Sequence, residues 1–300
     1  MQHSPSRRTF LLTLLATPLL GACAPLWAAP SRWPQEMDLK KQLAMLERQA
    51  QGRLGLSLLN TATQQHFSYR GEERFPVCST FKTLLVAAIL RQSMQNNKLL
   101  QQRPGFSEQD VQASGYAPVT ARHVASGMSI AELCAATIQY SDNAAANVLL
   151  KILGGPQALT AFMREVGDSH FRLDRWEPEL NSAIPDDLRD TSTPMAMVNS
   201  LNKLVLGDAL GLTQRAQLAD WLKGNTTGDK RIRAGVKSGW QVGDKTGTGA
   251  YGTTNDVAII WPDNAKPLLL GVYFTQQLKD ATPREDVIAS ATRIALQWAT

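Results

Sequence analysis

Residues 76–90, PVCSTFKTLLVAAIL, place a serine and a lysine just before seven consecutive apolar side chains. The run Leu84–Leu90 predicts a buried helix that begins at Ser79. The first N–H groups of a helix lack partners within it, and Lys82, three residues after Ser79, lies on the same face. Burial and the helix dipole lower the proton affinity of such a lysine, so it can accept the proton of the serine hydroxyl. The stretch therefore predicts a central helix and a candidate nucleophile.

Strand patterns lie on both sides of a helical middle. We expect strands at 53–59 and 66–70, and further strands at 239–245, 257–261 and 268–274. Helical patterns cover 34–50, 130–139, 144–153, 156–166, 194–204, 213–223 and 284–298. The simplest packing is an α/β (α+β) fold of two lobes: an antiparallel sheet flanked by terminal helices (about 30–71 and 223–300), and an all-helical lobe (about 72–222). We expect the active site between them.

Residues 1–29 predict an export signal that precedes one domain over 30–300. Arg7 and Arg8 precede an interrupted apolar stretch, too short for a membrane span, and small residues follow up to Ala29. SRRTFL, residues 6–11, resembles a twin-arginine signal, and LGAC, residues 20–23, resembles a lipobox. We expect cleavage near Ala28–Ala29, with a lipid anchor at Cys23 as the alternative, and a periplasmic location in either case.

The composition, 43% hydrophobic and 19% charged, is ordinary for a globular protein. Arg7 and Arg8 are the only charged residues of the first 29, so 29 basic and 26 acidic residues remain, a net charge of +3. They are scattered, and we expect no nucleic acid partner. After Cys23 only Cys78 and Cys134 remain, with no zinc spacing. We expect no metal, no cofactor, and a monomer that acts on a small molecule.

Two triplets place polar side chains at the ends of predicted elements. SDN, residues 141–143, is typical of a helix cap, but its serine can also carry a proton and its asparagine can bind substrate. KTG, residues 245–247, ends a strand, and the glycine at 249 permits close backbone approach. The serine–x–x–lysine spacing and the KTG pattern also occur elsewhere in the chain. We expect Ser200–Lys203, which has the serine–lysine spacing, to be a solvated helix face, and KSG at 237–239 to be a turn.

A polar excursion of 16 residues, from Arg175 to Asp190, lies between two helical regions. This length suits an Ω-loop, and an ion pair between Arg175 and Asp190 would hold its ends together. The loop contains Glu177, Pro178 and Asn181. Alone it would be interpreted as an ordinary surface loop.

Four patterns occur in a fixed order: Ser79/Lys82, Ser141–Asn143, Glu177–Asn181 and Lys245–Gly247. In this order the chain, over about 34–298, resembles the class A serine β-lactamases, for which serine–x–x–lysine, SDN, KTG and a loop glutamate are the known signature. Tyr116 and the stretch GM…ELC, residues 127–134, add to the resemblance. It implies hydrolysis of penicillins and cephalosporins, and resistance to these antibiotics.

The resemblance implies roles for the catalytic residues. Ser79 would be the nucleophile, with the N–H groups of Ser79 and Thr248 as the oxyanion hole. Lys82 and Glu177 are alternatives for the base of acylation. Ser141 would pass a proton to the β-lactam nitrogen.

The resemblance also implies the binding residues. Glu177 and Asn181 would hold the hydrolytic water, with a cis peptide at Glu177–Pro178. Asn143 would bind the acylamido group of the substrate, and Tyr116 would form a wall. The substrate carboxylate would meet the KTG segment and its neighbours, namely Lys245, Thr246, Gly247, Thr248 and Arg231.

The chain departs from parts of the family at its cysteines and at one arginine. Where many relatives join a cysteine to the position of Cys134, this chain has Val86, so Cys134 is expected to be a free buried thiol. Some relatives join a cysteine at the position of Cys78 to one just after KTG. Here that second position is Gly249, so this bond is absent. Thr254 stands where many relatives carry an arginine, and Arg231 resembles the alternative donor.

Other classes of protein share single features. A penicillin-binding DD-peptidase or a β-lactam sensor shares the serine, the lysine and KTG but lacks the glutamate over the acyl ester, so Glu177 favours hydrolysis. A serine glutaminase fits the loop and SDN poorly. GTGAYG, residues 247–252, matches a nucleotide-binding pattern, but a strand and not a helix is expected after it. No GxSxG occurs, which disfavours a Ser-His-Asp hydrolase.

Overall fold

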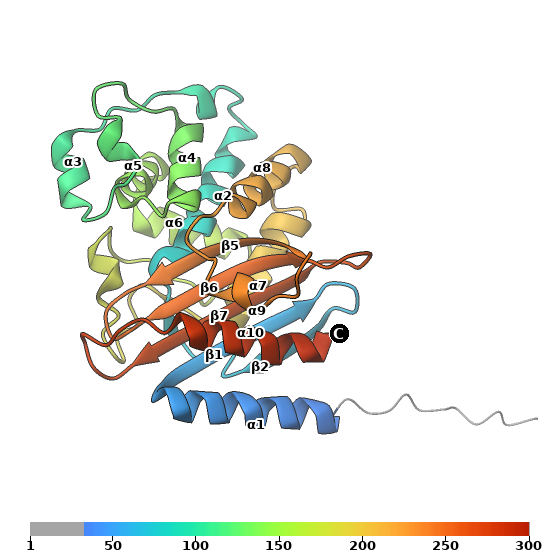
Figure 1. Ribbon diagram of the computed structural model, residues 1–300. Helices are drawn as coiled ribbons and strands as arrows, with labels where there is room; N and C mark the ends of the chain where they lie inside the picture. Colours follow the sequence, from blue (N-terminus) through green and yellow to red (C-terminus); the bar gives the residue numbers. More distant parts are fainter. Residues whose placement is uncertain (1–32, 300) are drawn as a thin grey trace, which may run out of the picture.

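The computed structural model describes residues 33–299. Five strands form one antiparallel sheet in the order β2-β1-β7-β6-β5 (Figure 1). Their bounds are β1 Gly52–Asn60, β2 Gln65–Tyr69, β5 Gln241–Thr248, β6 Thr254–Trp261 and β7 Leu268–Gln276. Because β1 lies beside β7, the two ends of the chain build one sheet, as the strand patterns predicted.

Two apolar clusters hold the sheet from opposite faces. On one face, α1 (Trp33–Ala50) and α10 (Glu285–Ala299) lie side by side (Figure 1), and Phe67 stacks on Trp298 with ring centroids 5.9 Å apart. Leu54, Leu56 and Leu58 point into this layer, and Leu59 belongs to the cluster on the other face. Because both faces are covered, β1 is buried without interruption from Leu54 to Leu59.

The helical lobe is built around α2 (Phe81–Ser93), whose residues from Phe81 to Leu90 are all buried. Other helices of this lobe surround it and pack against it (Figure 1). The helices around it and against the sheet are α3 Glu108–Ala113, α4 Ile130–Gln139, α5 Asn143–Leu153, α6 Pro156–Glu165, α7 Pro194–Leu201, α8 Leu212–Lys223 and α9 Ile232–Gly235. A two-stranded ladder of β3 (Phe75–Pro76) and β4 (Thr191–Ser192) brings the end of the Ω-loop beside the start of α2. The predicted α+β fold, with its five-stranded sheet and helical lobe, is confirmed.

Some details differ from the sequence expectations. The helix predicted from Ser79 starts as a 3₁₀ turn, Cys78–Thr80, before α2. The helix expected to reach residue 204 ends as an α-helix at Leu201 and continues as a π-helical turn. The solvated face expected at Ser200 is wrong: Ser200 is buried and donates to Oδ2 of Asp168 at 2.7 Å. The Ser200 hydroxyl can be buried in this helix because the Asp168 carboxylate accepts its hydrogen bond.

The predicted export signal, including Cys23, lies outside the described residues. None of the helices between residues 33 and 299 is long and apolar enough to cross a membrane.

Candidate active site

Ser79 lies where the start of α2 meets the end of β5. A Cβ on Gly247 would lie 2.9 Å from the carbonyl oxygen of Val77, so only glycine lets β5 run this close to the 3₁₀ turn. Cys78 has a φ of +43°, a conformation that L-residues rarely adopt and that is often found at functional sites. The serine side chain is thus held on a turn between two rigid elements.

Lys82 is completely buried and binds residues of two segments, the SDN triplet and the Ω-loop. Its Nζ donates to the carbonyl oxygen of Ser141 at 2.7 Å and to Oδ1 of Asn143 at 2.6 Å, and it lies 3.3 Å from Oγ of Ser141. An ion pair of 3.1 Å joins it to Oε1 of Glu177. Burial lowers the pKa of Lys82, although the charge of Glu177 opposes this. The SDN triplet and the glutamate of the Ω-loop thus meet at the amine of Lys82.

Glu177 is the carboxylate of the site. Its Oε1 accepts a hydrogen bond of 3.4 Å from Oγ of Ser79, and its Oε2 accepts one from Nδ2 of Asn181. The Glu177–Pro178 peptide is cis, as the resemblance implied. One carboxylate therefore contacts both the serine hydroxyl and the buried amine.

Asn147, which the sequence analysis missed, holds the backbone of Glu177. The Nδ2 group of Asn147 donates to the carbonyl oxygen of Glu177 at 2.9 Å, and the N–H of Glu177 donates to Oδ1 of Asn147 at 3.0 Å. The only signal in the sequence is an asparagine within the apolar run of α5. Such a residue is interpretable only when its partner, 30 positions away, is known.

The Ω-loop, residues 175–190, is closed at its ends by the expected ion pair. Nε of Arg175 lies 2.6 Å from Oδ2 of Asp190, whose Oδ1 accepts the N–H groups of Asp174 at 2.7 Å and Arg175 at 3.0 Å. Asp190 is completely buried. The loop is therefore pinned by a satisfied carboxylate.

SDN serves as a cap and as part of the site. Asp142 caps α5 by accepting the N–H of Ala145 at 2.9 Å, while Ser141 and Asn143 face Lys82. Ser141 has a φ of +57°. Nδ2 of Asn143 donates one hydrogen to the carbonyl oxygen of Ser114 at 3.0 Å, and an amide nitrogen carries two hydrogens. The triplet therefore caps α5 and also contacts the buried amine of Lys82. The side chain of Tyr116, whose carbonyl accepts the N–H of Asn143, is 52% exposed.

Two cations, Lys245 of the KTG segment and Arg231, lie near the end of β5. Lys245 is buried, and its Nζ donates to the carbonyl oxygen of Thr246 at 2.9 Å. Burial, and then the charge of Lys82, lower the pKa of Lys245 to about 7. Arg231 donates to the carbonyl oxygens of Gly247 and Asn255 and to Oγ1 of Thr248, each at 2.8 Å. Arg231, Lys245 and Thr248 thus meet at the end of β5.

Other expectations concern cysteines, the repeated motifs and metals. Cys78 and Cys134 are free and buried, as expected, and a Cβ on Gly249 would lie 2.7 Å from Sγ of Cys78. Ser238 and Gly239 form the expected turn, and β6 follows residues 247–252 instead of a helix. Between residues 33 and 299, no three His, Cys, Asp or Glu side chains are grouped to hold a metal ion.

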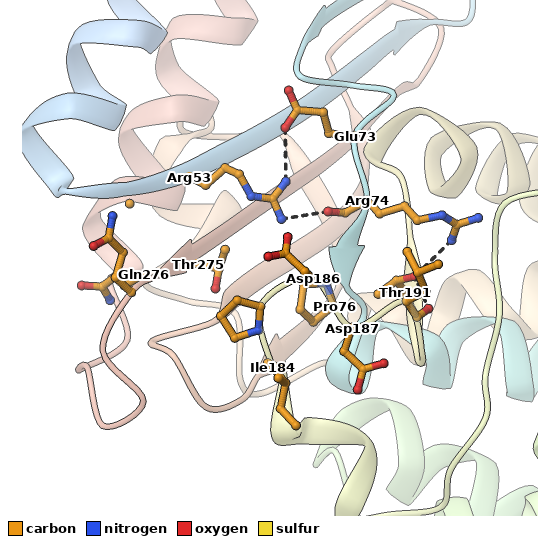
Figure 2. Close-up of a pocket in the computed structure, with 15 residues that line it drawn as sticks. Arg53, Glu73, Arg74, Pro76, Ile184, Asp186, Asp187, Thr191, Thr275 and Gln276 are labelled. Atoms are coloured by element: carbon orange, nitrogen blue, oxygen red, sulfur yellow. Dashed lines mark hydrogen bonds and ion pairs between the residues drawn. The ribbon is translucent and has the colours of Figure 1, made fainter.

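A separate cavity of about 650 Å³ lies behind the far end of the Ω-loop (Figure 2). Residues 183–188 form one wall, and β1, β7 and the segment around Arg74 form the others. Arg53 crosses it, donating to Glu73 at 3.3 Å and to the carbonyl oxygen of Arg74 at 2.8 Å. None of the residues predicted for the active site lines this cavity.

A fold of this topology, with a hydroxyl, a buried amine and a buried carboxylate in contact between its lobes, defines a serine hydrolase of the β-lactam-recognising class. Residues 38–299 match the model of the β-lactamase enzyme family, and the chain belongs to that family. It is 50% identical to β-lactamase OXY-1 of Klebsiella oxytoca over 297 residues, which is 99% of each chain.

Solved structures agree. A β-lactamase from Desulfarculus baarsii DSM 2075 is 52% identical with a TM-score of 0.86, over 88% of this chain and 98% of that one. An ancestral class A β-lactamase is 54% identical with a TM-score of 0.83, over 86% of this chain and 99% of that one. The chain is thus a class A serine β-lactamase, which hydrolyses penicillins and cephalosporins and gives resistance to them.

Proposed function

We propose that this enzyme opens the β-lactam ring through an acyl-enzyme on Ser79 and that Glu177 drives its hydrolysis. The observation that carries the proposal is the position of the Glu177 carboxylate, 3.4 Å from Oγ of Ser79 and 3.1 Å from Nζ of Lys82. In acylation, Oγ of Ser79 attacks the ring carbonyl and its proton goes to Glu177 or to Lys82. The lowered pKa of Lys82 suits it to accept a proton, and the contact between Ser79 and Glu177 suits the carboxylate equally.

The oxyanion of the tetrahedral intermediate is assigned to the N–H groups of Ser79 and Thr248. Gly247 supports this assignment because it brings the end of β5 against the turn that carries Ser79. One such donor lowers the barrier by about 3–4 kcal/mol. Two rigid elements would thus hold both donors in place before the reaction.

Ring opening needs a proton on the β-lactam nitrogen as its bond to the carbonyl carbon breaks. We assign this step to Oγ of Ser141, which lies 3.3 Å from Nζ of Lys82 and can recover its proton there. The substrate carboxylate is assigned to Lys245, Thr246, Thr248 and Arg231, and the acylamido group to the second Nδ2 hydrogen of Asn143. Tyr116 would close one side of the site.

Deacylation is assigned to Glu177 and Asn181. Glu177 would take a proton from a water that attacks the ester of Ser79, which releases the product and restores the hydroxyl. Oδ1 of Asn181 is buried and receives no hydrogen bond from any residue between 33 and 299, so it can accept one from that water. A penicillin-binding protein would lack this base.

We also propose that the enzyme acts as a monomer in the periplasm, without a nucleic acid partner. The arginine pair and apolar stretch of residues 1–29 support export. Cell fractionation would test the location. Incorporation of radiolabelled palmitate would distinguish a lipid anchor on Cys23 from cleavage near Ala28–Ala29.

The deciding experiment is a time course with a chromogenic cephalosporin, followed by intact-mass analysis of the protein. Turnover far beyond one equivalent with little remaining adduct is the expected result. A burst of one equivalent and a persistent adduct on Ser79 would mean that Glu177 does not deacylate. An adduct on another residue would overturn the assignment of the nucleophile.

A further inference from the structure

Two carboxyl groups lie buried beside the KTG segment, and the mechanism proposed above uses neither. Asp244 on β5 and Asp256 on β6 are both completely buried. Asp256 is paired with Thr246 across the ladder, so Asp244 is its diagonal neighbour on the same face. Their buried side chains therefore share one face of the sheet, close enough for the charge of Asp244 to raise the pKa of Asp256. Two ionised carboxylates are not stable side by side without water, so one of them must be protonated.

The partners of Asp244 identify it as the ionised member. Its Oδ1 accepts from Nε of Arg233 at 2.6 Å, and its Oδ2 accepts from Nδ2 of Asn225 at 2.6 Å. Gly228 also lies close, and a Cβ there would be 1.9 Å from Oδ2. Arg233 and Asn225 both donate a hydrogen, which suits a carboxylate that only accepts.

The partners of Asp256 identify it as the member that holds the proton. Its Oδ2 accepts the N–H of Ile232 at 3.0 Å. Its Oδ1 is buried and receives no hydrogen bond from residues 33–299. Burial, and then the charge of Asp244, raise the pKa of Asp256 well above its usual range. An O–H on Oδ1 completes the hydrogen bonding of both side chains.

We propose that Asp256 is protonated and donates this proton to Asp244, and that this carboxyl pair positions Arg231 and Lys245 for the substrate carboxylate. Asp256 binds the residue after Arg231, and Asp244 directly precedes Lys245. The pair therefore links the start of α9 to β5, and with them the two cations. This role rests on the proposed function of those cations, whereas the position of the proton does not.

The surrounding charges agree with one proton. The charged groups that face the pair, or bind a residue that does, are Arg231 and Arg233 at α9, Lys245 on β5 and Glu285 at the start of α10. Arg233 makes the direct ion pair with Asp244, at 2.6 Å. With Asp256 neutral, this arginine balances the single negative charge of the pair. With both ionised, a second buried charge would have no direct cationic partner.

The first test compares urea unfolding of the wild type and of Asp256→Asn between pH 5 and 8. The native wild type would hold one proton more than its unfolded chain above the usual carboxyl pKa of ~4, so its unfolding constant should rise up to tenfold per pH unit relative to the variant. The asparagine amide can accept from the N–H of Ile232 and donate to Asp244 without binding a titratable proton. Parallel pH dependences would overturn the proposal.

Asp244→Asn is the matched control, because it places an amide beside the proposed O–H and leaves Arg233 without its carboxylate. We expect it to be the less stable variant. The opposite order would place the proton on Asp244 and refute the assignment. If neither variant folds, infrared spectroscopy of the wild type at pH 7 decides the matter. A protonated carboxyl band is expected, and its absence would contradict the proposal.

The positioning role is tested by kinetics with a penicillin. Asp256→Ala should raise KM at least tenfold and change kcat less, since it displaces the cations and not the serine. Asp256→Asn should return KM to near the wild-type value. If kcat falls by the same factor as KM rises in both variants, and asparagine does not rescue KM, the pair has no role in positioning.

Discussion

Asn147 binds Glu177 by both backbone polar groups, with hydrogen bonds of 2.9 and 3.0 Å. The contact joins α5 of the helical lobe to the Ω-loop at the residue that carries the carboxylate. Asn147 thus fixes the backbone of a loop residue that is 30 positions away to a buried helix.

Replacement of Asn147 by alanine should release Glu177 from α5. Buried backbone groups left without partners cost about 1–3 kcal/mol each, and a displacement of about 1 Å slows a catalytic step by roughly 100-fold. We expect a lower Tm and an accumulating acyl-enzyme, measured by intact mass during turnover. Lys151→Ala, on the exposed side of the same helix, is the control. Unchanged deacylation in Asn147→Ala would mean that the loop holds Glu177 by itself.

Glu177→Ala should still react with a penicillin but should trap the adduct, because the water would lose its base. Ser79→Ala should give no covalent adduct at all. Mass spectrometry of both variants after incubation with benzylpenicillin measures this. Normal turnover by the Glu177 variant would refute the deacylation assignment.

A side chain on Gly249 would separate β5 from the Ω-loop. Its Cβ would lie 2.7 Å from the carbonyl oxygen of Asn181 and 2.7 Å from Sγ of Cys78. We expect Gly249→Ser to lower the free energy of unfolding by about 1–3 kcal/mol and to reduce kcat for benzylpenicillin. Gly105→Ser, where no atom lies within 4 Å of the added Cβ, should change neither quantity. Equal behaviour of the two variants would show that this contact yields without cost.

The pKa of about 7 at Lys245 predicts a pH-dependent KM. Lys245 loses its positive charge as the pH rises through 7, so binding of a substrate carboxylate should weaken on the alkaline side. KM for a penicillin, measured from pH 6 to 9, should rise in the wild type. In Lys245→Arg it should stay level, because a guanidinium remains charged over this range. The same rise in both would assign the titration to another group.

Cys78 and Cys134 should resist alkylation in the native enzyme. Burial raises the pKa of both thiols, and only the thiolate reacts. Iodoacetamide at pH 8, followed by peptide mapping, should leave both unmodified until urea is added. Rapid labelling of Cys78 in the folded protein would show that the 3₁₀ turn opens.

The residues predicted from sequence lie at the ends of helices and strands, where polar side chains interrupt an apolar pattern. Ser79, Lys82, SDN and KTG are of this kind, and their order along the chain, through its resemblance to a known family, selected them from repeats of the same patterns. Asn147 stands inside an apolar run, and Asp256 stands directly before one. Their partners lie 30 and 12 positions away, so only the packing of the elements gives them meaning. Ser200 was misjudged for the same reason.

The cavity behind the Ω-loop divides the loop into two parts that differ in support. The part with Glu177 is fixed by Asn147 and by the Arg175–Asp190 pair, whereas residues 183–188 border a hollow of about 650 Å³ and expose Ile184 and Leu188. Changes of loop length should therefore be absorbed at 184–188, while an added residue before Asn181 would move the carboxylate of Glu177. Sequence changes after Asn181 therefore have open space beside them, whereas changes before it would disturb the contacts that hold Glu177.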